Sequence, residues 1–367
     1  MNKRARKIVF DYLPHIVKTA IMFNAPSLYS FFEIRPTSVN IMLTNRCNLR
    51  CVMCRQWRQE HKQELSTDEW KKILLDLKKN RIKNIHFTGG EPLLRDDLAA
   101  LIRYCKENGF TTGLTTNGML MNEELLNALI RSGLRSVAIS VDALSDRYEK
   151  IRGLENTFGR LKSAAIAIAR ARKIKGIDAY INFTLMNENI EDFYQVKRFA
   201  DDIGLPVGLC LLDKNSSIFD LDDNKNRFWI REEKDIKRLD VLLDFLKGEL
   251  RKNPRSLILN FPSLEYIKNY FSDPRQSHIP CVISQDRIFI DPYGDIFGGC
   301  LSMGVLGNIK EVSLGVISKE KKYKDAKKNM FYKRCPGCSC GYIFNIRHMP
   351  GRILKDIATR IHSVMAG

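Results

Sequence analysis

Six strand-like runs alternate with helix-like segments between residues 36 and about 212, and this alternation limits the possible folds more than any other feature. The runs lie at 39–44, 84–88, 111–116, 136–141, 179–185 and 207–212. Parallel neighbouring strands need long crossovers, which are usually helical. We therefore predict a parallel sheet with helices outside it. Six units favour a partial (β/α)6 barrel over a closed barrel of eight.

Helix-like segments fill the intervals between these strands. Ser66 followed by Glu69 is a capping-box pattern, which predicts a helix continuing to about residue 79. Gly109 stands just past a second predicted helix, where helices commonly end on glycine. That second helix is predicted over 96–108, and the remaining helices are predicted over 122–131, 157–173 and 190–202. Each predicted strand after the first is therefore preceded by a helix.

The chain divides into four predicted parts: a basic amphipathic segment over 1–35, the barrel with its linker over 36–255, a second region over 256–345, and a basic amphipathic helix over 346–367. Acidic residues and other polar residues make 213–235 a loop, linker or lid, and a helix is expected from about 232 to 252. In the second region, Pro292-Tyr293-Gly294 turns a predicted hairpin between 287–291 and 296–299.

Three cysteines follow the first predicted strand. Cys47, Cys51 and Cys54 have the spacing C-x3-C-x2-C. Three thiolates can surround one face of a cubane [4Fe–4S] cluster, which usually takes four cysteines, and so leave one iron open. Zinc with a fourth ligand, or three buried thiols without a metal, are the alternatives for this spacing.

A glycine-rich turn, Gly89-Gly90-Glu91-Pro92, follows the second predicted strand. Loops after consecutive parallel strands emerge at the same end of the sheet, where α/β folds bind ligands. The cysteine loop and this turn should therefore face each other. The two glycines would let a ligand approach the backbone, and Glu91 could accept from an ammonium group. A plain tight turn is the alternative.

Together, in this order and each after its own strand, the two motifs resemble the radical S-adenosylmethionine (SAM) superfamily over roughly residues 38–212. The resemblance implies that Cys47, Cys51 and Cys54 hold a [4Fe–4S] cluster. It also implies that SAM chelates the open iron and that the Gly89-Gly90-Glu91 turn binds its amino group. Further positions that the resemblance places near SAM are Met53, Thr115, Thr116, Asn117, Ser140 and Asp142.

A second cysteine group lies in the last third of the chain. Cys281 and Cys300 bracket the predicted hairpin, and Cys335 and Cys338 form a C-x2-C turn. Four such thiolates suit either a cluster or a zinc ribbon. The region resembles the SPASM/twitch extension of radical SAM enzymes but has fewer cysteines than a full SPASM region. This implies one auxiliary [4Fe–4S] cluster on these four residues, with Cys340 either spare or an alternative ligand.

Two other cysteines stand apart from both groups. Cys105 lies in a predicted helix and Cys210 in a predicted strand. Free cysteine is often simply a small core residue, so we expect both to be buried structural thiols.

The resemblance implies an oxidoreductase-type enzyme. SAM would be cleaved reductively to a 5′-deoxyadenosyl radical that abstracts hydrogen from a peptide, lipid or sugar-type substrate. The auxiliary cluster would accept an electron, and a flavodoxin or ferredoxin would supply the reducing electron. The alternative is a non-catalytic zinc or Fe–S binding protein. Glu91 beside the full cysteine triplet favours the enzyme, because metal binding alone does not require that turn.

The chain is strongly basic, with 60 Lys and Arg against 42 Asp and Glu and a net charge of +18. Such a charge suits an anionic membrane surface, nucleic acid or a phosphorylated substrate, or is merely solvated. Basic terminal segments and the basic run 317–334 are typical of anchors to an anionic membrane surface, and the alternative is that the terminal helices pack on the barrel with their charges solvated. Aromatic residues are too sparse among them for a nucleic-acid partner to be expected. No apolar run reaches ~20 residues and no export signal is visible, which predicts a cytoplasmic protein with optional peripheral contact at the inner membrane face.

Overall fold

The computed structural model describes residues 17–18, 21–22, 25–31, 35–60, 62–212, 227–276, 280–281 and 283–338. Several predicted features lie outside these residues. They are the C-terminal helix over 346–367, Cys340, most of the N-terminal helical segment and most of the acidic loop before residue 227.

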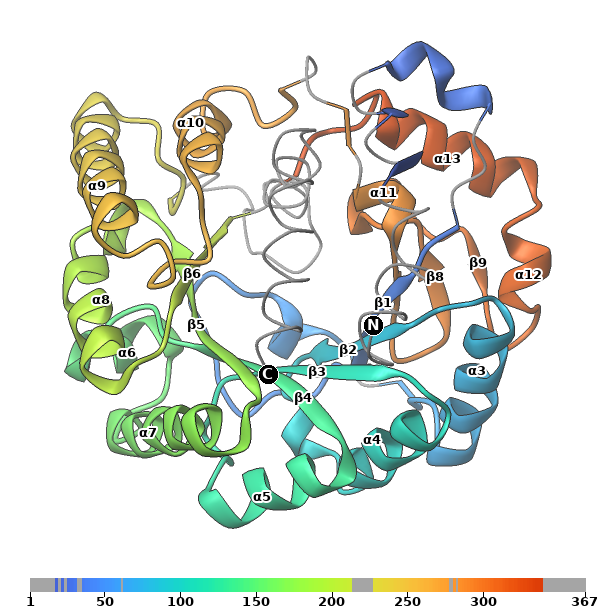
Figure 1. Cartoon of the computed structure of the whole chain (residues 1–367), viewed down its shortest axis with the longest axis horizontal. Helices are drawn as coiled ribbons and strands as arrows, with labels where there is room; N and C mark the ends of the chain where they lie inside the picture. Colours follow the sequence, from blue (N-terminus) through green and yellow to red (C-terminus); the bar gives the residue numbers. More distant parts are fainter. Residues whose placement is uncertain are drawn as a thin grey trace, which may run out of the picture.

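Six parallel strands form the centre of the molecule, as predicted. They are β1 (Ser38–Thr44), β2 (Asn84–Gly89), β3 (Thr111–Thr116), β4 (Leu134–Ser140), β5 (Asp178–Leu185) and β6 (Val207–Leu211). Each strand pairs with the next one along the chain in parallel register. Their bounds differ from the predicted ones by two residues or fewer. The strands curve into a partial barrel (Figure 1), which confirms the predicted fold class.

The predicted helices cover the outer side of this curved sheet (Figure 1). They are α3 (Thr67–Lys79), α4 (Leu98–Glu107), α5 (Glu123–Ser132), α7 (Phe158–Lys175) and α8 (Asp192–Ile203). Ser66 caps α3 through a reciprocal capping box with Glu69, as the sequence predicts. One further helix in this part, α6 (Ser145–Arg152), was not predicted and lies between β4 and α7.

Strand alternation separates an apolar outer face from a polar inner face of the barrel. On β2, Ile85 and Phe87 are buried in the core shared with the helices. His86, between them, points the other way, and its Nε2 lies 2.7 Å from Thr115 Oγ1 on β3. Gly113 leaves room for this contact, because a Cβ there would lie 2.6 Å from His86 Nδ1. The inner face is therefore lined with polar groups.

The predicted hairpin is present and extends the same sheet. Strand β7 (Arg287–Ile290) pairs with β1 in parallel, β8 (Asp295–Phe297) pairs back on β7, and β9 (Gly307–Asn308) follows β8. The strand order is β6-β5-β4-β3-β2-β1-β7-β8-β9. The C-terminal region is thus continuous with the open edge of the barrel at β1.

The remaining helices and helical turns pack around this framework. They are η2 (Pro26–Phe31), η3 (Gln56–Arg58), η4 (Pro92–Leu94), η5 (Asn187–Asn189), α9 (Glu233–Lys252), α10 (Phe261–Tyr270), α11 (Ile283–Asp286), η6 (Leu301–Met303), α12 (Leu314–Ile317) and α13 (Lys321–Phe331). The sequence predicts α9 but not α10, α12 or α13. Within the described part of the chain, no helix combines the length and apolar character needed to cross a bilayer.

Candidate functional site

The three early cysteines lie in the loop that follows β1, and each sulfur has a hydrogen-bond donor. The backbone N–H of Leu49 donates to Cys47 Sγ at 3.5 Å, and that of Gln56 donates to Cys54 Sγ at 3.4 Å. A side chain described below donates to Cys51 Sγ. Hydrogen bonds to sulfur are a usual feature of iron–sulfur ligands.

Burial raises the pKa of all three thiols, to about 11 for Cys47 and about 12 for Cys54, with the same direction for Cys51. Bare thiolates are therefore disfavoured in this loop. A positively charged iron centre would stabilise the thiolate form and use the donors that already point at the sulfurs. The donor set thus fits a cluster.

The glycine-rich turn is bonded directly to the cysteine loop. The N–H of Gly90 donates to the carbonyl of Thr44 at 2.7 Å, and the N–H of Glu91 donates to the carbonyl of Arg46 at 2.8 Å. The approach is possible only for glycine: a Cβ on Gly90 would lie 2.1 Å from the Arg46 carbonyl oxygen, and Gly89 has a φ of +127°. The two motifs are therefore neighbours at one end of the barrel, as the sequence predicts.

Glu91 lies beneath the turn with its carboxylate fully buried. It accepts hydrogen bonds from Leu93 N at 3.1 Å, Thr116 Oγ1 at 2.8 Å and Asn117 N at 2.8 Å. Burial raises the pKa of Glu91 to about 7. The sequence suggests that Glu91 accepts from a ligand ammonium, but the structure gives it three protein donors. Its contacts join the turn after β2 to the end of β3.

The end of β3 reaches the cysteine loop through Asn117. Its Nδ2 donates to Asn48 Oδ1 at 2.8 Å and lies 4.0 Å from Cys47 Sγ. Its Oδ1 accepts from Met119 N, which holds the side chain in this orientation. Thr115 instead points to the inner face of the barrel, where it contacts His86.

Arg152 is a site residue that sequence reasoning missed. It ends α6, is 7% exposed, and its Nη1 donates to Cys51 Sγ at 3.6 Å. Its backbone carbonyl accepts from Arg50 N, and Val52 N donates to the Ile151 carbonyl, so the end of α6 is fixed on the loop. The one sequence signal is the helix-ending pair Arg152-Gly153, in which Gly153 has a φ of +68°.

Asp142 is the buried partner of Arg152. The Arg152 Nη2 lies 2.6 Å from Asp142 Oδ2, and Thr184 N donates to Asp142 Oδ1 at 2.7 Å. Burial alone would lower the pKa of Arg152, but Asp142 and Cys51 raise it overall, so the guanidinium stays charged. The Asp142 side chain contacts α6 and β5, and it braces Arg152 against the cysteine loop.

Two other residues predicted to lie near SAM, Met53 and Ser140, follow or end strands of the barrel. Met53 is buried in the cysteine loop, with 3% of its surface exposed. Ser140 ends β4, is partly exposed and pairs in register with Asn182 of β5. Both residues are thus at the same end of the barrel as the glycine-rich turn.

Three of the four cysteines in the second group lie near one another. Cys281, Cys300 and Cys338 are buried, and Cys335 is partly exposed. Burial raises the pKa of Cys281, the buried Lys333 ammonium opposes that rise, and Cys300 and Cys335 add to it, so these groups are close enough to interact. Gly337, with a φ of +90°, lets the C-x2-C turn pass close to the backbone of Pro274.

The two cysteine groups lie toward opposite ends of β1. Strand β7 runs parallel to β1 with Ser38 opposite Arg287. Cys281 precedes β7, and Cys300 follows β8, which runs back toward the same end. Both therefore lie toward the start of β1, whereas the loop of Cys47 follows its end.

The other predicted thiols differ from each other. Cys105 in α4 is fully buried, as expected, whereas Cys210 in β6 is only partly buried, so its prediction as a core thiol was wrong. The described cysteines form no disulfide. Nor do the described His, Cys, Asp and Glu side chains include a group of three or more arranged to hold a single metal ion.

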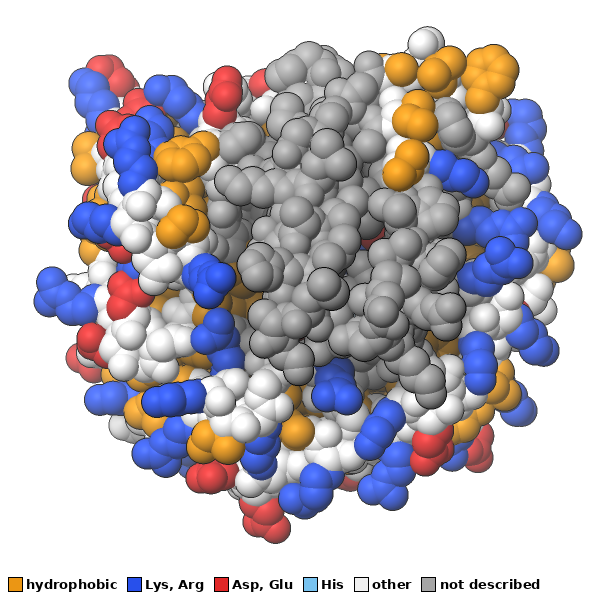
Figure 2. Space-filling model, in the orientation of Figure 1, with side chains coloured by type: hydrophobic (Ala, Val, Ile, Leu, Met, Phe, Trp, Pro, Cys, Tyr) orange, Lys and Arg blue, Asp and Glu red, His pale blue; other side chains and the backbone are white. Residues whose placement is uncertain are grey.

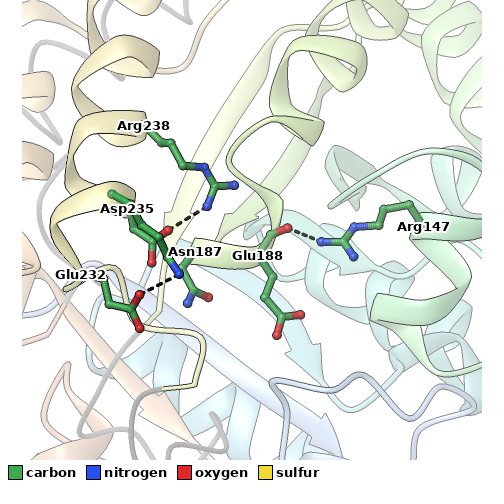
Figure 3. Close-up of a pocket in the computed structure, with 7 residues that line it drawn as sticks. Arg147, Asn187, Glu188, Glu232, Asp235 and Arg238 are labelled. Carbon is green, nitrogen blue, oxygen red and sulfur yellow. Dashed lines mark hydrogen bonds and ion pairs between the residues drawn. The ribbon is translucent and has the colours of Figure 1, made fainter.

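A polar depression of about 500 Å³ lies beyond the end of β5 (Figure 3). Its lining residues are Arg147, Asn187, Glu188, Glu232, Lys234, Asp235 and Arg238. Arg238 pairs with Asp235 at 2.8 Å, Lys234 pairs with Glu232 at 2.8 Å, and Arg147 donates to the Glu188 carbonyl. The depression is thus lined by paired charges and carries no net charge of its own.

A radical SAM superfamily profile matches residues 41–200. The chain is 32% identical over 166 residues to Fe-coproporphyrin III synthase of Methanosarcina barkeri, a match covering 45% of this chain and 41% of that protein. It is 42% identical over 107 residues to PqqA peptide cyclase of Rhodopseudomonas palustris, covering 29% of this chain and 28% of that protein. These matches span less than half of either curated relative.

Two solved structures share the fold over most of the chain. SuiB of Streptococcus suis bound to S-adenosylmethionine has a TM-score of 0.63 at 17% identity, covering 82% of this chain and 70% of SuiB. The enzyme anSMEcpe with bound AdoMet and the Cp18Cys peptide has a TM-score of 0.64 at 17% identity, covering 90% of this chain and 99% of anSMEcpe.

Residues 41–200 are therefore the part of the chain that matches the radical SAM superfamily. The fold that the chain shares with SuiB and anSMEcpe extends beyond residues 41–200, because these structures cover 82% and 90% of the chain. The cofactors of this class are SAM and a [4Fe–4S] cluster, with an auxiliary cluster in the SPASM/twitch type.

Proposed function

We propose that this chain is a radical SAM oxidoreductase with its catalytic cluster on Cys47, Cys51 and Cys54. The observation that carries the proposal is the pair of backbone hydrogen bonds joining the Gly90-Glu91 turn to the carbonyls of Thr44 and Arg46. They hold three thiols and a glycine turn within the reach of one SAM molecule. When bound, the cluster and SAM supply one-electron cleavage of SAM and hydrogen abstraction from substrate.

The residues around the cluster loop would orient these cofactors. Gly89 and Gly90 offer bare backbone to the SAM amino group, and Met53, Ser140, Thr115, Asn117 and Asp142 are the further SAM-side positions that we propose. Glu91 and Asn117 also hold the loops in place, because their polar atoms bond to Thr116, Asn48 and Met119. Arg152 keeps a positive charge beside Cys51 Sγ, which would offset the negative charge of a thiolate-bound cluster.

We further propose an auxiliary [4Fe–4S] cluster on Cys281, Cys300, Cys335 and Cys338. Its position toward the start of β1, away from the Cys47 loop, supports an electron-accepting role over direct contact with SAM. Four cysteine ligands would also leave no iron open for substrate. The proposed parts of the chain are 1–35, 36–255, 256–345 and 346–367.

A peptide is the substrate class that the comparisons favour. PqqA peptide cyclase is named for a peptide, and SuiB and anSMEcpe are each solved with a peptide bound. A non-peptide molecule, which includes the lipid- and sugar-type substrates expected from the sequence, is the second candidate, because Fe-coproporphyrin III synthase is a relative named for a non-peptide product. A flavodoxin or ferredoxin is the proposed reductant, and the proposed location is the cytoplasm with peripheral membrane contact.

Anaerobic reconstitution with iron and sulfide tests this function. The proposal expects 5′-deoxyadenosine to be released when the loaded protein is mixed with SAM and dithionite. A matched Cys47→Ser/Cys51→Ser/Cys54→Ser variant should release none. Stoichiometric zinc without SAM cleavage would instead establish a non-catalytic metal-binding protein.

A further inference from the structure

A short apolar segment, η2, is fixed on the basic helix α13. The ring of Tyr29 lies 4.7 Å from that of Phe331 and 5.7 Å from that of Tyr332. Tyr332 Oη donates to the Pro26 carbonyl at 2.9 Å, and Tyr29 Oη donates to Gln285 Oε1 at 3.4 Å. Because these contacts tie η2 to α13 and to α11, the exposed side chains of η2 and those of α13 are held in a fixed position relative to each other.

The outer face of α13 is positively charged. Tyr323, Ala326 and Met330 turn inward and are buried. The exposed cations along this stretch are Lys319, Lys321, Lys322, Lys324, Lys328 and Arg334, against the acidic Glu320 and Asp325. Lys321 pairs with Asp325, whereas Lys322, Lys324 and Lys328 are exposed and make no ion pair with the described residues.

The exposed side of η2 carries no charge and presents two apolar side chains beside the exposed Ser27 and Ser30. Phe31 is 79% exposed and Leu28 is 37% exposed. Figure 2 shows hydrophobic side chains beside Lys and Arg side chains at the upper right, where Figure 1 places η2 and α13. We define the η2–α13 surface by Leu28, Phe31, Lys322, Lys324 and Lys328. It combines an exposed aromatic ring with three exposed lysines of α13.

We propose that the η2–α13 surface docks on an anionic lipid membrane, with Phe31 inserted at the headgroup boundary and the lysines on lipid phosphates. An apolar tip next to Lys and Arg is the arrangement of interfacial membrane anchors. A protein partner fits less well, because lysine is depleted in protein interfaces. Single-stranded nucleic acid fits less well, because its binding platforms use several stacked aromatic rings. This surface is independent of SAM chemistry.

Vesicle co-sedimentation of the full-length protein at physiological ionic strength tests the proposal. One set of vesicles is phosphatidylcholine with roughly one third phosphatidylglycerol, and the other is phosphatidylcholine alone. Binding is expected only to the first set. The variant Lys322→Glu/Lys324→Glu/Lys328→Glu should lose at least about tenfold in affinity, since each cation contributes at an anionic surface. Phe31→Ser should lose about fivefold.

A matched control separates the surface from net charge. Lys79→Glu/Arg103→Glu/Lys162→Glu changes the net charge equally on α3, α4 and α7, where all three residues are exposed. This control should bind vesicles like the unaltered protein. Equal loss in the control, full binding by the α13 variant, or tighter binding to a mixed-sequence single-stranded RNA than to the vesicles would each overturn the proposal. None of these results depends on SAM cleavage.

Discussion

At the scale of single residues, the site depends on glycine positions at which a Cβ atom would clash with the backbone of a neighbouring loop. Gly90 brings its N–H to the Thr44 carbonyl, and its Cα faces the Arg46 carbonyl across a gap that a methyl group would close. The obstruction is backbone rather than a flexible side chain, so a larger residue would have to separate the two loops. The positive φ of Gly89 and the closeness of Gly90 to the Arg46 carbonyl therefore require glycine at both positions of the turn.

Gly90→Ala is expected to destabilise the protein by about 2 kcal/mol through overpacking and to weaken SAM binding by more than about tenfold. Denaturant unfolding and equilibrium dialysis with SAM measure the two effects. Gly248→Ala on α9 is the control, because nothing lies within 4 Å of a Cβ there. It should stabilise the protein by up to about 1 kcal/mol, as alanine favours helix. An unaltered SAM affinity in Gly90→Ala would contradict the close fit of the loops.

His86 gives the molecule a pH dependence at acidic pH. Burial, and then the nearby Arg287, lower the pKa of His86 to about 4. An unfolded histidine titrates near 6.5, so between about pH 6.5 and 4 the unfolded chain binds a proton that the folded chain does not. Stability should therefore fall as the pH drops through this range, by up to about 3 kcal/mol.

Urea unfolding of the cofactor-free protein at several pH values measures this effect of His86. The variant His86→Gln, which keeps a polar group near Thr115, should show a flatter decline in unfolding free energy between pH 6.5 and 4. A decline identical to that of the unaltered protein would mean that other groups cause it.

At the scale of elements, local sequence patterns predicted the strands and most barrel helices, because each has its own apolar periodicity or cap. Thr111–Thr116 and the Ser66 cap are such cases. Helix α6 lacks this signal: it is strongly polar and has no side-chain cap. Its importance comes from the long-range contacts of Arg152 with Cys51 and Asp142, which no local pattern reveals. Glu91 was found by motif, but its bonds to β3 were not.

The fixing of α6 on the cysteine loop can be measured by a double-mutant cycle. Arg152→Leu should destabilise the protein by about 3 kcal/mol, because it leaves Asp142 buried without its cation. Asp142→Leu should cost a similar amount. The double variant should cost clearly less than the sum, with a coupling of about 2 kcal/mol. Denaturant unfolding of all four proteins gives this coupling, and strict additivity would show that the ion pair does not hold α6.

At the scale of the whole molecule, the hairpin converts a six-stranded half barrel into one continuous sheet. The hairpin itself was predictable from its Pro292-Tyr293-Gly294 turn. Its pairing with β1 was not, because pairing between strands almost 250 residues apart leaves no local trace. This pairing places one cysteine group toward each end of β1, which makes the two groups structurally separate sites.

Separate sites should load with iron independently. The unaltered protein is expected to hold about eight irons per chain, and loss of either cysteine group should leave about four. The two variants are Cys47→Ser/Cys51→Ser/Cys54→Ser and Cys281→Ser/Cys300→Ser/Cys335→Ser/Cys338→Ser, with Cys210→Ala as a control that keeps all the iron. Iron analysis and the low-temperature electron paramagnetic resonance spectrum of each reduced protein measure the result. If either variant lost all its iron while remaining folded, the two groups would form one interdependent centre, and the separation along β1 would not define two clusters.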